Sequence, residues 1–245
     1  MLSQDQQVKA CYRRKEWPLL PTPINVRVKF QKIGDLQYIS HLDLQRTLHR
    51  ILVRAGIPMW YTKGFNPHAK IVFSTPLSVG AQSVCEMVDI RIDRDMPCEE
   101  IKRLLNLEVT EELRILDVYL PTTKFSDIVW ASYEIEIHEK GITNFSETIQ
   151  KIVETDHIMA MKKTKSGEKE VDILPMIKSF LASADEKSEY LSIKAVLNVG
   201  QDNYLNPELL IQVLKQKFSI LSTDDSWYTV MRTATYFEDG ITVFE

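Results

Sequence analysis

Hydrophobic and polar residues alternate along the first half of the chain in an order that predicts four strands and two helices. Val26, Val28 and Phe30 alternate with polar residues, which is the period of a strand with one buried face. After Ser40, apolar residues recur at helical spacing until Gly56, which predicts a helix. The other expected elements are a hairpin, or a strand broken by a loop, over 60–74, a strand over 88–92, a helix that opens at Pro97 and a strand over 113–120. This order is the split βαββαβ pattern of a ferredoxin-like sandwich.

The second half of the chain repeats that order with a different sequence. Strands are expected over 133–137, 191–197 and 229–237, and helices over 144–153 and from Asn206 onward. Residues 159–171 have the pattern of a hairpin that turns near Ser166 and Gly167, whereas residues 173–184 fit a helix or an irregular segment. We therefore expect an α+β protein made of a duplicated ferredoxin-like sandwich, with antiparallel sheets and helices on one face.

These elements divide the chain into three parts. Residues 1–24 lack a sustained period and contain Pro18, Pro21 and Pro23, so we expect an N-terminal extension or tether. A first ferredoxin-like domain would cover 25–122, and a second, more divergent one would cover 128–245. The length of 245 residues and the 44% of hydrophobic residues are enough for a substantial buried core.

The composition excludes several classes of protein. No apolar run approaches the roughly 18 to 20 residues that span a bilayer, and charges and prolines occupy the place of a secretory signal. We therefore expect a cytoplasmic protein with no membrane partner. Cys11, Cys85 and Cys98 are too widely spaced for a disulfide framework, a zinc site or an iron-sulfur cluster. Neither a metal nor a cofactor is expected.

The net charge of -4 conceals an asymmetry between two parts of the chain. Residues 1–75 contain 12 Lys and Arg against 4 Asp and Glu, whereas the remainder contains 18 against 30. Residues 61–80 contain no acidic residue at all. A basic region of this kind favours a polyanionic ligand such as RNA, although the acidic part could instead dock on the basic part.

The basic residues are expected to gather on one surface of the first domain. Arg27 and Lys29 would lie on the open face of the sheet, and His41 would lie in the first helical turn, where free N–H groups favour an anion. Nearby aromatic rings could stack on unpaired bases, or could simply fill the core. The aromatic residues are Tyr38, Trp60, Tyr61 and Phe65. The expected anion-binding residues are Arg27, Lys29, His41, Arg46, Arg50, Lys63, Asn66, His68 and Lys70.

The stretch from residue 38 to residue 90 resembles the signature of the radical SAM-linked protein family. The matching pieces are Ser40-His41-Leu42-Asp43, Arg46, Gly64-Phe65-Asn66-Pro67-His68, Pro76-Leu77, Val79-Gly80, Glu86 and Asp89. The resemblance implies a protein encoded beside, or fused to, a radical SAM protein with a cobalamin-binding-like region. This chain lacks the C-x3-C-x2-C motif, so it resembles the stand-alone form that would act with a separate enzyme.

The sequence thus predicts a non-catalytic accessory or substrate-presenting partner of a radical SAM enzyme, which binds RNA or that enzyme through its basic surface. No common hydrolase, metalloprotease or nucleotide-binding motif is present. Two alternatives stay open. One is a metal-independent endoribonuclease, similar in architecture to CRISPR repeat-processing enzymes, with His41 or His68 as the general base. The other is a purely protein-binding module.

Overall fold

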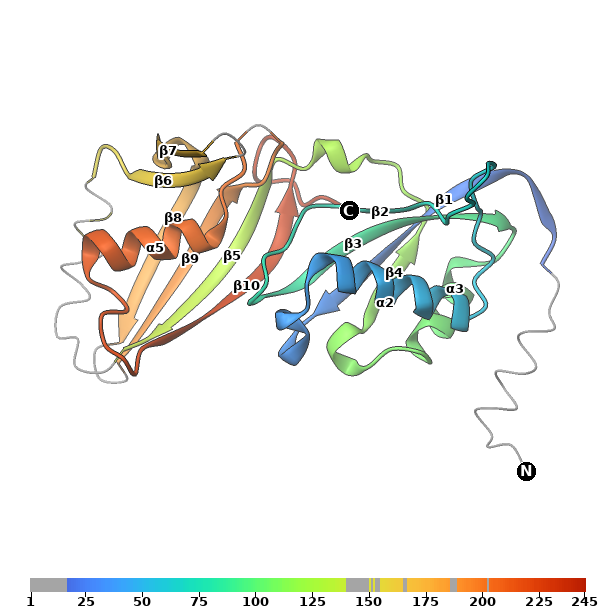
Figure 1. Cartoon of the computed structure of the whole chain (residues 1–245), viewed down its shortest axis with the longest axis horizontal. Coiled ribbons are helices and arrows are strands. Elements are labelled where there is room, and N and C mark those ends of the chain that lie inside the picture. Colours follow the sequence, from blue (N-terminus) through green and yellow to red (C-terminus); the bar gives the residue numbers. More distant parts are fainter. Residues whose placement is uncertain are drawn as a thin grey trace, which may run out of the picture. The chain divides into compact units, whose positions relative to one another are not determined.

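The protein has a mixed α+β fold with strands that pair mostly antiparallel (Figure 1). A computed structural model describes residues 17–139, 150, 152, 155–164, 167–185, 189–201 and 203–245, and three α-helices lie within these ranges. The chain divides into two compact units: unit 1 is Met1–Pro76 with Glu86–Thr123, and unit 2 is Leu77–Cys85 with Lys124–Glu245.

Unit 1 has the helices and most of the strands that its hydrophobic pattern predicts, but within 60–74 only Ile71–Phe73 forms a strand, which pairs with β3 (Ala81–Arg94) rather than with residues 60–62. Its strands are β1 (Leu19–Lys32), β2 (Ile71–Phe73), the later part of β3 and β4 (Ile115–Tyr119), and its helices are α2 (His41–Arg54) and α3 (Cys98–Asn106). The strands lie in the order β4-β1-β3-β2. Apolar residues of these strands and of both helices form one buried core, because each element has one apolar face. The core includes Val26, Val28, Phe30, Leu44, Leu48, Leu52, Ile90, Ile92, Ile101 and Leu105.

Strand β1 begins earlier than its sequence pattern predicts. It starts at Leu19 rather than near Asn25, so residues 19–24 belong to a strand and not to the expected N-terminal extension. A proline lacks the N–H donor but keeps its carbonyl oxygen as an acceptor. Just before the strand, Pro18 O accepts from Asp95 N at 2.8 Å, and within the strand, Pro23 O accepts from the Arg91 guanidinium. The rest of the expected extension, residues 1–16, lies outside the described residues.

Unit 2 contains a second set of four strands with the same spatial order. These are β5 (Trp130–His138), β8 (Ile177–Asp185), β9 (Tyr190–Asn198) and β10 (Trp227–Tyr236), arranged β10-β5-β9-β8. Helix α5 (Pro207–Phe218) begins where expected, because the Asn206 side chain caps it by accepting from Glu208 N. In both units, the fourth strand lies beside the first, followed by the third and the second. The first residues of β3 add a parallel partner to β10, with Ala81 opposite Val230.

The middle of unit 2 departs from the sequence prediction at one element. The segment 173–184, predicted to be a helix or irregular, forms strand β8 after a short 3₁₀ turn, Leu174–Met176. The strand pattern in this part of the sequence is weak, because a bulge near Ser179 interrupts the alternation of apolar and polar residues and the inward positions include two alanines. The expected hairpin is confirmed as β6 (Met159–Thr164) with β7 (Gly167–Asp172), while Ser166 of its turn and the helix expected over 144–153 lie outside the described residues, apart from residues 150 and 152.

Candidate functional site

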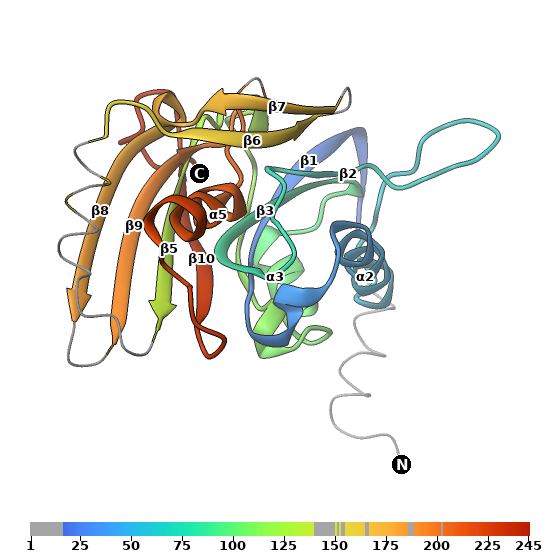
Figure 2. The ribbon, with the colours of Figure 1, turned by 60° about the vertical axis from the view of Figure 1, so that its left-hand side comes forward.

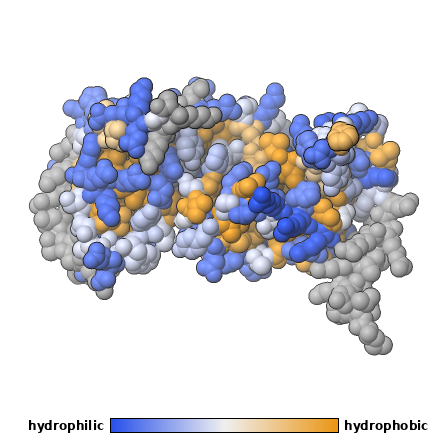
Figure 3. Space-filling model, viewed as in Figure 1, coloured by the Kyte–Doolittle hydropathy of each residue, from blue (hydrophilic) through white to orange (hydrophobic). Residues whose placement is uncertain are grey.

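An open groove in unit 1 collects several of the basic residues that the sequence singled out. It has a volume of about 570 Å³, and it lies between the outer face of α2 and the loop that joins α2 to β2. Figure 3 shows strongly hydrophilic residues gathered over α2, and Figure 2 shows the loop extending away from the helix and the strands of unit 1. The residues that line the groove are Gln45, Arg46, His49, Arg50, Tyr61, Pro67, His68, Ala69 and Ile71.

The outward face of the amphipathic helix α2 forms one wall of this groove. Leu44, Leu48 and Leu52 are buried in the core, so the opposite face of the helix must point outward. Arg46 and Arg50 are one helical turn apart on that outward face, and their side chains therefore lie side by side. The helix supplies two adjacent guanidinium groups to the groove.

The loop that forms the other wall is closed at its neck by hydrogen bonds. Thr62 N donates to His68 O at 3.0 Å, and His68 N donates to the Thr62 hydroxyl at 3.1 Å. Tyr61 pairs with Ala69 as an isolated bridge one step further from the tip. His68 Nδ1 lies 3.1 Å from the Thr62 hydroxyl and 3.3 Å from Asn66 O, so this nitrogen is engaged within the loop. Its Nε2 forms no hydrogen bond with the described residues.

The charges around the groove are mainly positive. None of the groove-lining residues is acidic. Arg46 pairs with Asp43 at 3.3 Å, but both side chains are largely exposed, so this pair is easily exchanged for another anion. Arg50 forms no ion pair with any residue that the structure describes. Arg54, one helical turn after Arg50, instead donates to Glu108 at 2.9 Å and lies outside the lining of the groove.

The start of α2 is a poorer anion site than expected. The Ser40 hydroxyl accepts from Asp43 N and donates to the Asp43 carboxylate at 2.7 Å, so Ser40 caps the helix. This cap uses one of the free N–H groups and adds a negative charge to the first turn, which disfavours a bound anion. His41 packs edge-on against Phe73, with the ring centroids 4.8 Å apart, and does not line the groove.

Arg27 is a clear correction to the expected surface. The sequence pattern predicts it on an open face, but its side chain is fully buried, with both ends of its guanidinium occupied. It donates to Asp89 at 2.7 and 3.0 Å and to the hydroxyl and carbonyl oxygens of Thr123 at 2.7 and 3.0 Å. The segment after β4 therefore covers this face of the sheet, and Arg27 is a structural residue. Lys29, on the same strand, is only half-buried.

The remaining predicted residues flank the groove without lining it. Lys63, Asn66 and Lys70 are exposed on the loop, so they can reach a ligand that extends beyond the groove. His49, which was not among the predicted residues, lines the groove beside Arg50. The sequence could have identified it, because His49 follows Arg46 by three residues and residues at that spacing share a helix face.

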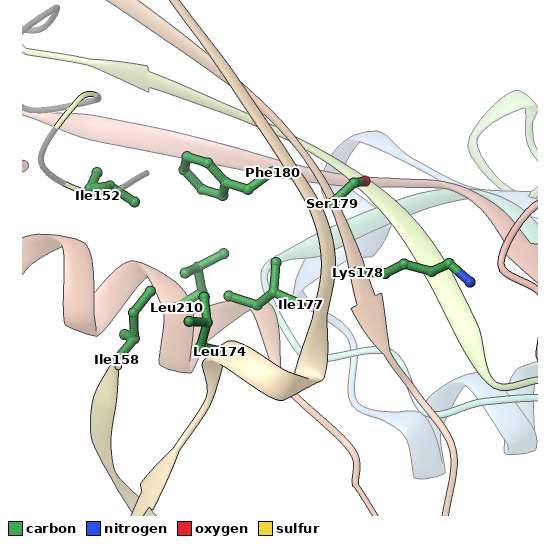
Figure 4. Close-up of a pocket in the computed structure, with 8 residues that line it drawn as sticks. All are labelled: Ile152, Ile158, Leu174, Ile177, Lys178, Ser179, Phe180 and Leu210. Atoms are coloured by element: carbon green, nitrogen blue, oxygen red, sulfur yellow. The ribbon is translucent and has the colours of Figure 1, made fainter. Parts of the chain in front are cut away.

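Unit 2 contains a pocket that is mostly apolar, in contrast to the basic groove of unit 1 (Figure 4). Six apolar side chains form most of its wall, whereas the Lys178 side chain points away from them. The Lys178 ammonium is engaged by the carbonyl oxygen of Asp239 and by the face of Trp130. The apolar residues are Ile152, Ile158, Leu174, Ile177, Phe180 and Leu210. The described lining of this pocket therefore offers mainly shape and hydrophobic contact.

Two kinds of feature are absent from the described ranges. Within them, His, Cys, Asp and Glu side chains do not form any group of three or more that could hold a metal ion. The helices of the same ranges include none with the length and apolarity needed to cross a membrane.

Comparisons with known proteins identify the family and a similar fold. A chain in the crystal structure of a Cbf5-Nop10-Gar1 complex is similar with a TM-score of 0.52, at 10% sequence identity, over 87% of this chain and 50% of that chain. The protein thus spans about half the length of that chain, and such a low identity shows the fold alone.

No curated protein matches. A family model described as an uncharacterized protein conserved in bacteria (DUF2344) matches residues 25–207. That description names no radical SAM protein, so this partner stays a prediction. Because the match includes both walls of the groove and most of the chain, the protein belongs to the DUF2344 family.

Proposed function

We propose that the protein is an accessory protein, without catalytic activity of its own, that binds RNA through the groove between α2 and the loop over 61–70. The observation that carries this proposal is the meeting of Arg46, Arg50 and His68 with the ring of Tyr61 in one open groove that has no acidic lining residue. Arginine forks bind phosphate oxygens strongly, and exposed rings stack on bases. Lys63 and Lys70 would extend the contact along the nucleic-acid backbone.

The duplicated ferredoxin-like architecture and the radical SAM partner are also part of our proposal. The identical strand orders of the two units support a duplicated ferredoxin-like architecture. The resemblance over residues 38–90 supports a radical SAM enzyme as the protein that receives the bound RNA, since the groove lies within that stretch. Co-purification from the native cell, scored for the enzyme with and without ribonuclease treatment, would test this partnership.

The decisive experiment is a binding titration of the full chain with a labelled RNA oligonucleotide at several salt concentrations. The variant R46A/R50A should bind at least tenfold more weakly, because each arginine would lose a charge-assisted hydrogen bond of about 1.5–3 kcal/mol. The slope of log affinity against log salt should fall by about 0.7 for each lost single-strand phosphate contact. The matched control is K215A/K217A, which removes two exposed charges from α5 in unit 2. Equal binding by wild type and R46A/R50A would contradict the proposal.

A metal-independent endoribonuclease is the second candidate, because His49 and His68 line the same groove. Two imidazoles can serve as general base and general acid in RNA cleavage without a metal. Incubation of the RNA with the protein in the presence of a chelator distinguishes the two functions. Cleavage that H49A and H68A each abolish would establish the enzyme, whereas intact RNA bound in the groove supports the accessory role.

A further inference from the structure

Phe65, at the tip of the loop over 61–70, has the most exposed large hydrophobic side chain among the described residues. The loop extends away from the strands and from α2, as Figure 2 shows. Within the described part of the chain, the Phe65 ring packs against no other aromatic ring. Burial of a phenylalanine is one of the larger favourable contributions to folding, and here the fold gains none of it. An exposed ring of this kind indicates a role in binding rather than in stability.

The surroundings of Phe65 favour a nucleic acid over an apolar protein pocket. The neighbouring loop residues include Lys63, His68 and Lys70, and the loop contains no acidic residue. Pro67 and His68 line the groove, so Phe65 lies two residues from its wall. The closed neck between Thr62 and His68 holds this arrangement together. Positive charge beside an exposed ring is the combination that binds unpaired nucleotides, in which the base faces are accessible.

We infer that the ligand of the groove is single-stranded RNA and that Phe65 stacks on one of its bases. This inference rests on the proposed RNA binding and adds the strandedness of the ligand and the residue that selects it. In a duplex, each base face is already covered by its neighbours, so the ring could contribute little. The arginines would then provide affinity for phosphates, and Phe65 would provide preference for an unpaired segment.

The test compares a short unstructured RNA with a duplex of the same length, using the full-length protein and the variants F65A, F65L and F65W. The wild type should prefer the single strand. F65A and F65L should lose about tenfold in affinity for the single strand, whereas F65W should retain it, because only an aromatic ring stacks on a base. The salt slope should stay the same in all three variants, since no charge is removed. The matched control is L181A, which truncates a largely exposed apolar side chain in unit 2.

The outcomes separate this inference from the function on which it rests. If the wild type binds neither RNA, both are overturned. A different outcome would be that R46A/R50A weakens RNA binding, whereas the wild type and F65A each bind the single strand as tightly as the duplex. The groove would then bind RNA, and only the stacking role of Phe65 would be wrong. Retention of full affinity by F65L would also overturn the inference, because it would show that any apolar side chain is sufficient. Melting temperatures close to that of the wild type are expected for all variants.

Discussion

The two units share a strand order but have opposite kinds of surface cavity. In unit 1, α2 and the following loop form an open groove with two arginines and two histidines. In unit 2, α5 and β8 surround a pocket that is mostly apolar. The strand order is therefore not what determines the chemistry. The outward face of one helix and the composition of one loop determine it, which is the general relation between a fold and the sites built on it.

One buried charge from each unit illustrates two different ways of stabilising it. Unit 1 buries the Arg27 guanidinium and pairs it with a side chain, Asp89. Unit 2 buries the Glu139 carboxylate directly after β5, where it accepts hydrogen bonds from the backbone N–H groups of Leu221, Ser222 and Thr223 and from the Ser222 hydroxyl. If the two units fold independently, substitutions of these residues in one unit should leave the hydrogen-exchange protection of the other unchanged.

The largest effect is expected from Arg27→Ala. It leaves the Asp89 carboxylate without its partner, and breaking such a buried pair costs about 3–5 kcal/mol of unfolding free energy. Hydrogen exchange followed peptide by peptide should show the loss of protection in β1, β3 and β4. A double variant, R27M/D89L, should recover much of the stability because neither charge remains. Equal loss of protection in β5 and β9 would show that the units unfold together and are not independent.

Glu139→Gln should produce the next largest effect, in unit 2. The neutral amide cannot accept from all the N–H groups that now point at the carboxylate, so we expect a loss of about 2–3 kcal/mol. Protection should fall first around residues 219–223 and in β5. The exposed Glu238→Gln is a suitable control, since it makes the same chemical change at a surface position. If both variants melt like the wild type, the Glu139 hydrogen bonds do not stabilise unit 2.

A moderate effect on binding is expected from the exposed loop lysines. The variant K63A/K70A should weaken RNA binding several-fold and reduce the salt slope by about 0.7 per lost phosphate contact. H68A should change the affinity modestly and leave the salt slope nearly unaltered, because it removes neither a lysine nor an arginine. Melting temperatures must accompany both variants, since the Asn66-Pro67 turn contributes to the shape of the loop. Wild-type affinity and slope in a folded K63A/K70A protein would show that these lysines are only solvated.

The smallest effect is a pH dependence within unit 2. His157 Nδ1 lies 2.8 Å from Asp172, and this hydrogen bond raises the pKa of His157 above its usual 6.5 and lowers the pKa of Asp172 below its usual 3.8. The His157 contribution to stability is therefore fully present below pH 6.5 and is lost as the pH rises through the raised value. The Asp172 contribution is present above pH 3.8 and is lost as the pH falls through the lowered value.

An NMR titration of the His157 ring can measure this contact directly. In the wild type, the midpoint should lie above 6.5, and D172N should move it back toward that value because the carboxylate is removed. A midpoint that is the same in both proteins would show that the contact does not persist in solution.

The sequence predicted those elements whose apolar residues follow a clear period. Val26, Val28 and Phe30 mark β1, and the leucines of α2 mark its buried face, because burial depends on positions within one element. The structural role of Arg27 could not be predicted, since its partners lie 62 and 96 residues away and only tertiary folding brings them together. The sequence placed Arg46, Arg50 and His68 on one basic surface, and these residues line the groove. Periodicity alone could not show that His41 packs against Phe73 instead of lining the groove.

The division of β3 has a consequence for attempts to separate the two units. The residues 77–85 group with unit 2, although the sequence on either side of them belongs to unit 1. A fragment that begins at residue 124 would therefore lack the parallel neighbour of β10, with Val230 to Arg232 losing the strand that pairs with them. The unpaired N–H and C=O groups of β10 would become an exposed edge, and such edges recruit strands from other molecules. We expect this fragment to self-associate, and a soluble version of unit 2 would need residues 77–85 joined back to it.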